Sequence, residues 1–224
     1  NVYSFGGSAG VLTIDVADGQ SQTFSGQLGS DHPDFSIVKA GDGSLTLSGA
    51  NTFTGTTTVS GGSLSIAADA ALGAAPSSAT TGHLTLDGGT LNTTASFTLN
   101  ANRGLVVDSS GGTLDTADAT TLSYAGDLTG SGNLTKSGTG TLVLSAASSR
   151  TGDTTVTAGT LTIGDSHTLQ HSTTDLAGGS LDVGNLTTVN LGALAGSSDF
   201  ALTNDSSAAI ALTAGGNNDS STYS

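Results

Sequence analysis

Residues 39–66 read KAGDGSLTLSGANTFTGTTTVSGGSLSI, and residues 136–163 read KSGTGTLVLSAASSRTGDTTVTAGTLTI. The two stretches align without gaps at an offset of 97, with 15 of 28 positions identical and five more exchanging Ser and Thr. A weaker echo at residues 23–26, 123–126 and 222–224 has nearly the same spacing. Self-similarity at a fixed period is typical of repeat architectures, so the chain is predicted to be a stack of similar units.

A shorter period runs through the whole chain. Pairs of apolar residues separated by one residue recur in steps of 17 to 21 residues. An i, i+2 pair puts two side chains on one face of a strand, so each step predicts one short strand with two inward side chains. The pairs are Leu45/Leu47, Leu64/Ile66, Leu84/Leu86, Leu105/Val107, Leu122/Tyr124, Leu142/Leu144, Leu161/Ile163, Leu181/Val183 and Phe200/Leu202. Leu12/Ile14, Val189/Leu191 and Ile210/Leu212 fall between the steps and fit further strands of the same turns.

Glycine pairs separate these strands, at residues 61–62, 88–89, 111–112 and 178–179. Glycine adopts the positive φ that a tight corner requires. A unit of this length cannot bury a core alone, whereas stacked units share one interior, so we predict an all-β solenoid of about ten rungs. A leucine-rich repeat has a similar period, but it needs a Leu-x-x-Leu-x-Leu pattern and usually a helical return, which these Thr- and Gly-rich returns do not supply.

The repeat continues on both sides of two proline-containing segments. Residues 67–76 and Asp31–Asp34 are therefore predicted to be loops that project from the stack rather than domain boundaries. Residues 1–224 are expected to form a single elongated domain. The chain starts without Met or a signal segment and stops where another copy should continue, so we expect a mature piece cut mid-repeat.

Composition excludes several classes of protein. Gly, Ser and Thr supply 103 of 224 residues, all 18 acidic residues are Asp, and the formal net charge is −14. Only Lys39, Arg103, Lys136 and Arg150 are basic, which argues against binding to nucleic acid or anionic lipid. The absence of cysteine excludes disulfides and thiolate chemistry. No apolar run is long enough to cross a membrane as a helix, so no direct membrane insertion is expected.

Residues 39–64 resemble the autotransporter-associated β-strand repeat of Gram-negative surface proteins, with Phe53 where that family has Tyr. Residues 136–161 match less well, because Arg150 replaces the aromatic residue, Ser148 replaces Asn and Ala158 replaces a corner Gly. Residues 124–136 resemble the family's lead-in. The resemblance implies a right-handed parallel β-helix passenger, exported across the outer membrane to the bacterial cell surface by a C-terminal β-barrel translocator outside this chain.

Candidate catalytic and metal-binding patterns are weak. Residues 6–10 fit Gly-x-Ser-x-Gly, but the following residues predict a strand where a hydrolase needs a helix. His167 and His171 have the spacing of two helical metal ligands, but they lie in strand and loop sequence with no third ligand. We therefore predict surface residues here rather than a site.

Asp115 and Asp182 each follow a Gly-Gly-x-Leu corner and are expected to point outward on equivalent edges of different rungs. A polysaccharide-cleaving β-helix would cluster Asp around Ca²⁺ near a basic residue, and Arg103 and Arg150 are the only basic candidates. The Ca²⁺-binding nonapeptide pattern fails, because Leu stands where its second glycine is required. Runs such as Thr160/Thr162 could suggest an ice-binding face, but aligned ranks on every rung are not predicted.

The sequence thus predicts a non-catalytic segment of an extracellular passenger, acting as a stalk or as an adhesive and self-associating surface. No residue is assigned a catalytic, cofactor-binding or metal-binding role, and no cofactor is expected. The expected partners are another copy of the chain or a ligand on a host surface. A β-helix enzyme acting on polysaccharide is the alternative.

Overall fold

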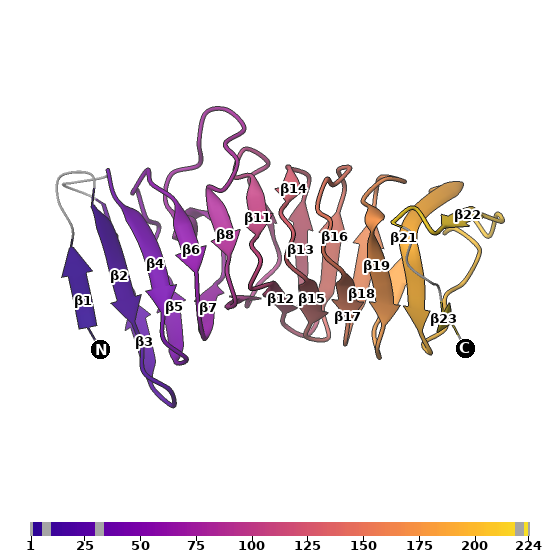
Figure 1. Ribbon diagram of the computed structural model, residues 1–224. Coiled ribbons are helices and arrows are strands. Elements are labelled where there is room, and N and C mark those ends of the chain that lie inside the picture. Colours follow the sequence, from indigo (N-terminus) through magenta and orange to yellow (C-terminus); the bar gives the residue numbers. More distant parts are fainter. Residues whose placement is uncertain (1, 6–9, 30–33, 218–221, 224) are drawn as a thin grey trace.

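The fold is an elongated stack of short strands, seen from the side in Figure 1. The computed structural model describes residues 2–5, 10–29, 34–217 and 222–223. Within these residues the only helical element is one short 3-10 helix, η1 (Asp69–Leu72). The stack has about nine turns. The predicted all-β solenoid is therefore confirmed, with a number of turns close to the expected ten.

Three sheets form the sides of the rod. Sheet A contains β1 (Val2–Phe5), β2 (Val11–Asp15), β4 (Ser36–Ala40), β6 (Thr57–Val59), β8 (Leu84–Leu86), β11 (Leu105–Val107) and β14 (Leu128–Thr129). Sheet B contains β3 (Ser21–Phe24), β5 (Ser44–Leu47), β7 (Ser63–Ile66), β9 (Thr90–Thr93), β12 (Gly112–Thr116), β15 (Leu134–Ser137), β17 (Thr154–Val156), β19 (Leu169–Leu176), β21 (Thr188–Gly196), β22 (Ala211–Ala214) and β23 (Thr222–Tyr223). Sheet C contains β10 (Phe97–Leu99), β13 (Thr121–Tyr124), β16 (Thr141–Leu144), β18 (Thr160–Ile163) and β20 (Ser180–Asp182). Apart from β1, which pairs antiparallel to β2, neighbouring strands such as β5 and β7 pair in parallel.

The inward side chains form continuous ladders. In sheet B, Leu45, Leu64, Leu91 and Leu114 are in register on four successive turns, and each is at most 1% exposed. The alternation of buried and half-buried residues along each strand follows from the two-residue period of a β-strand. Each turn thereby satisfies its backbone groups through its neighbours and shares their apolar interior.

The predicted apolar pairs do not form one ladder. The series lies on sheet B as far as Ile66, moves to sheet A at Leu84 and moves to sheet C at Leu122. The last pair fails, because Leu202 is 52% exposed. Strands on all three sides carry the same local pattern, so regular spacing in sequence does not reveal a change of side.

The two long repeats consequently occupy different sides of the rod. The first copy runs through β4 and β5 on sheets A and B, whereas the second runs through β15 and β16 on sheets B and C. The irregular segment that follows is residues 48–56 in the first copy and 145–153 in the second. The offset of 97 residues therefore corresponds to four full turns of the solenoid plus one step to the next sheet, from sheet A to sheet B for the first strand of the repeat.

Glycine corners close the turns. Gly62 and Gly159 are equivalent in the two repeats and have φ values of 53° and 64°. A Cβ at Gly62 would lie 2.2 Å from the carbonyl oxygen of Gly43, and one at Gly159 would lie 2.3 Å from that of Gly140. Glycine is required there by the left-handed conformation and by the close stacking of successive corners.

One long loop leaves the stack between β7 and β8, at residues 67–83, and projects from the rod in Figure 1. It contains η1 and includes the predicted loop at residues 67–76. The other predicted loop, Asp31–Asp34, lies outside the described residues except for the exposed Asp34.

Candidate interaction surface

All four basic side chains of the protein lie inside the rod. Lys39, Arg103 and Lys136 are 0% exposed, and Arg150 is 2% exposed. Sequence reasoning placed Arg103 and Arg150 as the only basic candidates for a polysaccharide-cleaving site. Their burial removes both from any surface site, because neither guanidinium reaches solvent.

Each repeat lysine ties two successive corners together. Lys39 Nζ donates to the carbonyl oxygens of Ala40 at 2.8 Å, Gly41 at 2.8 Å and Gly61 at 3.1 Å. Lys136 Nζ donates to the equivalent oxygens of Ser137 at 2.6 Å, Gly138 at 2.8 Å and Ala158 at 3.2 Å. Burial lowers the pKa of Lys136 to about 8, and the Asp115 carboxylate acts in the opposite direction. Sequence reasoning missed this role, although the signal was present in the Lys at the start of both copies.

The exterior is therefore acidic without compensating cations. None of the described Asp residues is buried, and both basic residue types are confined to the interior. Of the described Asp side chains, Asp69 is the one that pairs with a Lys or Arg side chain, namely Arg103, with Oδ1 2.8 Å from Nε. A surface of this charge repels polyanions and attracts cationic partners, whereas neutral partners meet no net repulsion.

Two ranks of small polar side chains run along the outer face of sheet B. The first rank is Ser21, Ser44, Ser63, Thr90, Thr113, Thr135 and Thr155, and the second is Thr23, Thr46, Ser65, Asn92, Asp115 and Ser137. Two neighbouring pairs bond directly: Ser44 Oγ donates to Ser21 Oγ at 2.9 Å, and Ser137 Oγ donates to Asp115 Oδ2 at 2.7 Å. Threonine ranks on every rung are not formed, as expected, but sequence reasoning did not predict these mixed ranks, because register brings together hydroxyls that sequence spacing does not align. We call this surface the hydroxyl face.

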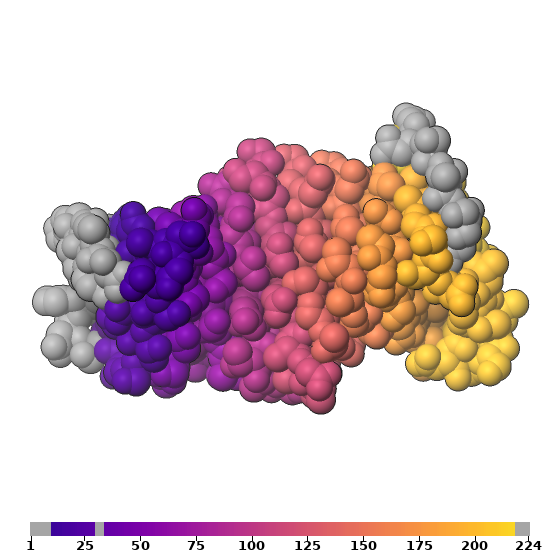
Figure 2. All heavy atoms as spheres, turned by 90° about the horizontal axis from the view of Figure 1, so that it is seen from below, coloured from indigo at the N-terminus to yellow at the C-terminus, as the bar shows by residue number. Residues whose placement is uncertain are grey.

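The hydroxyl face extends over seven successive turns. Figure 2 shows how the turns follow one another along the rod without a break between the two ends. An open groove runs beside its first four turns, lined by Gly19, Gln20, Ser21, Asp42, Gly43, Ser44, Gly62, Ser63 and Thr90. The ranks mix Ser, Asn and Asp with Thr, so this is a hydrogen-bonding surface rather than a uniform threonine array.

The remaining sequence candidates are separated in space. Asp115 lies on sheet B and Asp182 on sheet C, so they are not on equivalent edges as expected, and Asp182 Oδ2 accepts from Thr162 Oγ1 at 3.0 Å. His167 and His171 are exposed, and His167 Nδ1 lies 3.3 Å from Asp165 Oδ1. In the described part of the chain no three His, Asp or Glu side chains gather as a metal site would require. Residues 6–9 of the Gly-x-Ser-x-Gly pattern lie outside the described residues.

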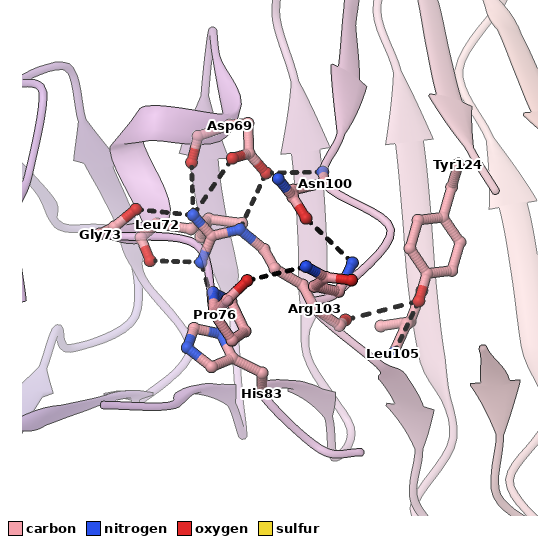
Figure 3. Close-up of polar contacts among 10 residues, drawn as sticks. Asp69, Leu72, Gly73, Pro76, His83, Asn100, Arg103, Leu105 and Tyr124 are labelled. Atoms are coloured by element: carbon pink, nitrogen blue, oxygen red, sulfur yellow. Dashed lines mark hydrogen bonds and ion pairs between the residues drawn. The ribbon is translucent and has the colours of Figure 1, made fainter. Parts of the chain in front are cut away.

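The projecting loop is held by a clasp around Arg103, drawn in Figure 3. Arg103 Nη1 donates to the carbonyl of Leu72 at 2.9 Å, and Nη2 donates to that of Gly73 at 2.6 Å and to Asp69 Oδ2 at 3.2 Å. Asn102 Nδ2 adds a bond to the carbonyl of Pro76 at 2.9 Å. We call Asp69, His83 and Arg103 the clasp.

Tyr124 fixes the backbone beneath the clasp. Its hydroxyl accepts from the Leu105 N–H at 3.0 Å and donates to the Asp127 carbonyl at 2.8 Å. Burial raises the pKa of Tyr124 to about 12. The hydroxyl therefore stays protonated near neutral pH and holds the start of β11.

The solenoid and its two repeats define a class of protein. Residues 37–66 and 134–163 match the family described as Passenger-associated-transport-repeat. The chain is a repeat-bearing segment of an autotransporter passenger, a class that is exported and exposed at the cell surface. Within the described residues no helix is both long and apolar enough to span a membrane.

A named relative supports this assignment. The chain is 42% identical over 158 residues to the Adhesin BmaC autotransporter of Brucella suis biovar 1 (strain 1330). The match covers 68% of this chain and 5% of that protein, so the chain spans a small fraction of the relative's length. No solved structure matches the chain.

Proposed function

We propose that this segment is a non-catalytic, adhesive part of a surface passenger and that the hydroxyl face is its contact surface. The observation that carries the proposal is the register of this face over seven turns, which presents donors and acceptors at a fixed spacing of about 4.8 Å along the rod. The printed name of the relative, an adhesin, agrees with an adhesive role. The burial of Arg103 and Arg150 speaks against the polysaccharide-cleaving alternative.

Lateral self-association is one use of such a face. Two rods lying side by side would exchange hydrogen bonds between Ser, Thr and Asn side chains on many turns, each contact contributing little and the array contributing more. Acidic side chains on the rods oppose this pairing at neutral pH. A receptor with neutral polar groups would use the same face without that repulsion.

The test compares two matched pairs of substitutions. Thr113→Gln with Thr135→Gln places long neutral side chains on the hydroxyl face, whereas Thr58→Gln with Thr85→Gln places the same chemistry on the outer face of sheet A. Beads coated with each protein are assayed for clumping and for attachment to host cells. We expect the first pair to lose most of both activities and the second to retain them. Equal behaviour of the two pairs would contradict the assignment of this face.

A further inference from the structure

The loop at residues 67–83 is anchored to the rod by a residue from far along the chain. Arg103 lies between β10 and β11, yet it donates to the carbonyls of Leu72 and Gly73 and pairs with the Asp69 carboxylate. Asp69 Oδ1 also accepts from the Asn100 N–H at 2.9 Å. These bonds fix the position of the loop relative to the stack.

His83 sits at the base of this loop and completes the clasp, as Figure 3 shows. It is 4% exposed, and its Nδ1 lies 3.3 Å from Arg103 Nη1. A guanidinium only donates hydrogen bonds, so His83 Nδ1 must accept and the ring proton must reside on Nε2. That Nε2 is buried and makes no hydrogen bond of ordinary geometry, and its one backbone partner is the Thr54 carbonyl that faces the ring. The closed clasp therefore requires a neutral imidazole.

The positive charge of Arg103 acts on His83 more strongly than the negative charge of Asp69 does. Arg103 faces His83 directly, whereas the Asp69 carboxylate on η1 is already engaged by Arg103 Nε and Nη2. From the segment before β6, the Thr54 carbonyl faces the ring, and Asp34 lies beyond it, accepting from the Thr54 hydroxyl at 3.1 Å. Burial and then Arg103 lower the pKa of His83, and Thr54 and Asp69 offset only part of this effect.

We propose that the clasp is an acid-sensitive latch, in which protonation of His83 breaks its bond to Arg103 and releases the loop at residues 67–83 from the rod. A proton on Nδ1 removes the acceptor that Arg103 uses and places two cations side by side in a buried site. Release of the loop lets the imidazolium and the guanidinium reach water. Water then solvates both cations and supplies the hydrogen-bond acceptor that Arg103 has lost. The surface that the passenger presents would thereby change with acidity, independently of the hydroxyl face.

The pH window follows from the direction of the shift. The pKa of His83 is lowered in the folded state from its ordinary 6.5, so an open loop binds the proton more readily than a closed one. The clasp is fully stable above that value and loses stability as pH falls below it. Between the two pKa values the ratio of open to closed loop rises by up to about tenfold per pH unit.

The test uses the absence of cysteine from the chain, which makes any introduced thiol unique. A spin label on Ala75→Cys reports on the exposed part of the loop, and one on Thr139→Cys reports on an exposed corner of the rod. We expect acidification from about pH 7.5 to about pH 4.5 to raise the mobile fraction several-fold at position 75 and to leave position 139 unchanged. His83→Gln keeps an acceptor for Arg103 without titrating, so its loop should remain ordered at both pH values.

Three results would overturn the latch. They are an acid transition that persists in His83→Gln, the same transition at position 139, and an immobile loop at a pH where the His83 imidazole is protonated. Nuclear magnetic resonance of the histidine rings in the unsubstituted protein measures that protonation directly, so the inference stays testable if His83→Gln does not fold. His171→Gln, an exposed histidine on the rod, is the matched control and should leave the loop transition intact.

Discussion

Phe53 and Arg150 occupy the same position of the repeat, 97 residues apart, and both side chains are buried. Phe53 packs against Phe35, with ring centroids 5.3 Å apart. Arg150 instead fills its site with hydrogen bonds, to the carbonyls of Gly132, Gly152 and Asp153 and to the hydroxyls of Thr154 and Ser172. One position of the solenoid thus accepts either an apolar ring or a guanidinium surrounded by acceptors.

The first prediction follows from this exchange. Arg150→Ala should lower the free energy of unfolding by about 3 kcal/mol, because it leaves buried carbonyls without donors and opens a cavity. Arg150→Phe, the side chain of the other copy, should lower it less because the ring refills the volume. Urea unfolding measures both, and Ser149→Ala at the exposed neighbouring position should change stability by less than about 0.5 kcal/mol. Equal losses for Ala and Phe would mean that volume does not matter at this site.

The burial of such cations could not be predicted from residue type. Lysine and arginine are almost never fully buried unless paired, so the expectation for Lys39 or Arg103 is a solvated side chain. The acceptors that make burial tolerable are backbone carbonyls at the corners, and every residue supplies one. Sequence therefore predicts strands, corners and the solenoid well, but it does not indicate which side chains reach those carbonyls.

The second prediction concerns alkaline stability. Burial lowers the pKa of Lys136 to about 8, below its ordinary 10.5, so the folded state gives up this proton before the unfolded chain does. The free energy of unfolding should therefore rise as pH increases from about 8 toward 10.5. Below pH 8 the contribution of Lys136 should not change with pH. Urea midpoints at the two ends of this range, compared between the unsubstituted protein and Lys136→Met, isolate the effect. The prediction fails if the unsubstituted protein loses stability relative to Lys136→Met as pH rises.

The third prediction tests the register of sheet C. Leu144 is 2% exposed and lies in the ladder between Tyr124 and Ile163, whereas Val143 points outward and is half-buried. Leu144→Asp should destabilise by more than about 4 kcal/mol, because a carboxylate would be placed unpaired in a dry interior. Val143→Thr should cost less than about 1 kcal/mol. Thermal unfolding that ranks the two variants in the opposite order would contradict the assigned faces.

The fourth prediction contrasts two glycines with the same substitution. A Cβ at Gly132 would lie 1.7 Å from the carbonyl oxygen of Asp108, whereas a Cβ at Gly26 would meet nothing within 4 Å. Gly132→Ala should therefore cost several kcal/mol by forcing two stacked corners apart, on the order of a strongly destabilising core change. Gly26→Ala should be neutral or stabilise by up to about 1 kcal/mol, because it reduces the freedom of the unfolded chain. A similar loss for both would show that the corners are not closely stacked.

The hydroxyl face marks a second limit of sequence reasoning. Ser63 and Thr90 lie 27 positions apart and yet are direct neighbours, because the loop at residues 67–83 lengthens that turn. Ser44 and Ser63 are neighbours at a distance of only 19 positions. Rank formation depends on the path of each turn, which varies with inserted loops and extra strands such as β10. A fixed period in the sequence therefore does not identify which Ser and Thr side chains become neighbours on the hydroxyl face.

The last prediction concerns the dependence of association on charge. The exterior carries Asp carboxylates and no exposed Lys or Arg, so repulsion between rods acts against pairing of their hydroxyl faces at neutral pH. Protonation toward the isoelectric point of about 4.1 removes that repulsion, and added salt screens it beyond a distance of about 10 Å at 0.1 M.

Light scattering should therefore report more association as pH falls from about 8 to about 4 and as salt is raised at neutral pH. Thr113→Gln with Thr135→Gln should lower association under every condition without altering its direction with pH or salt, because it changes the face and leaves the charge intact. Asp118→Asn and Asp205→Asn, which remove exposed carboxylates, should raise association at neutral pH and make it less sensitive to salt. Scattering that is flat in both pH and salt would mean that carboxylate repulsion does not control the contact between rods.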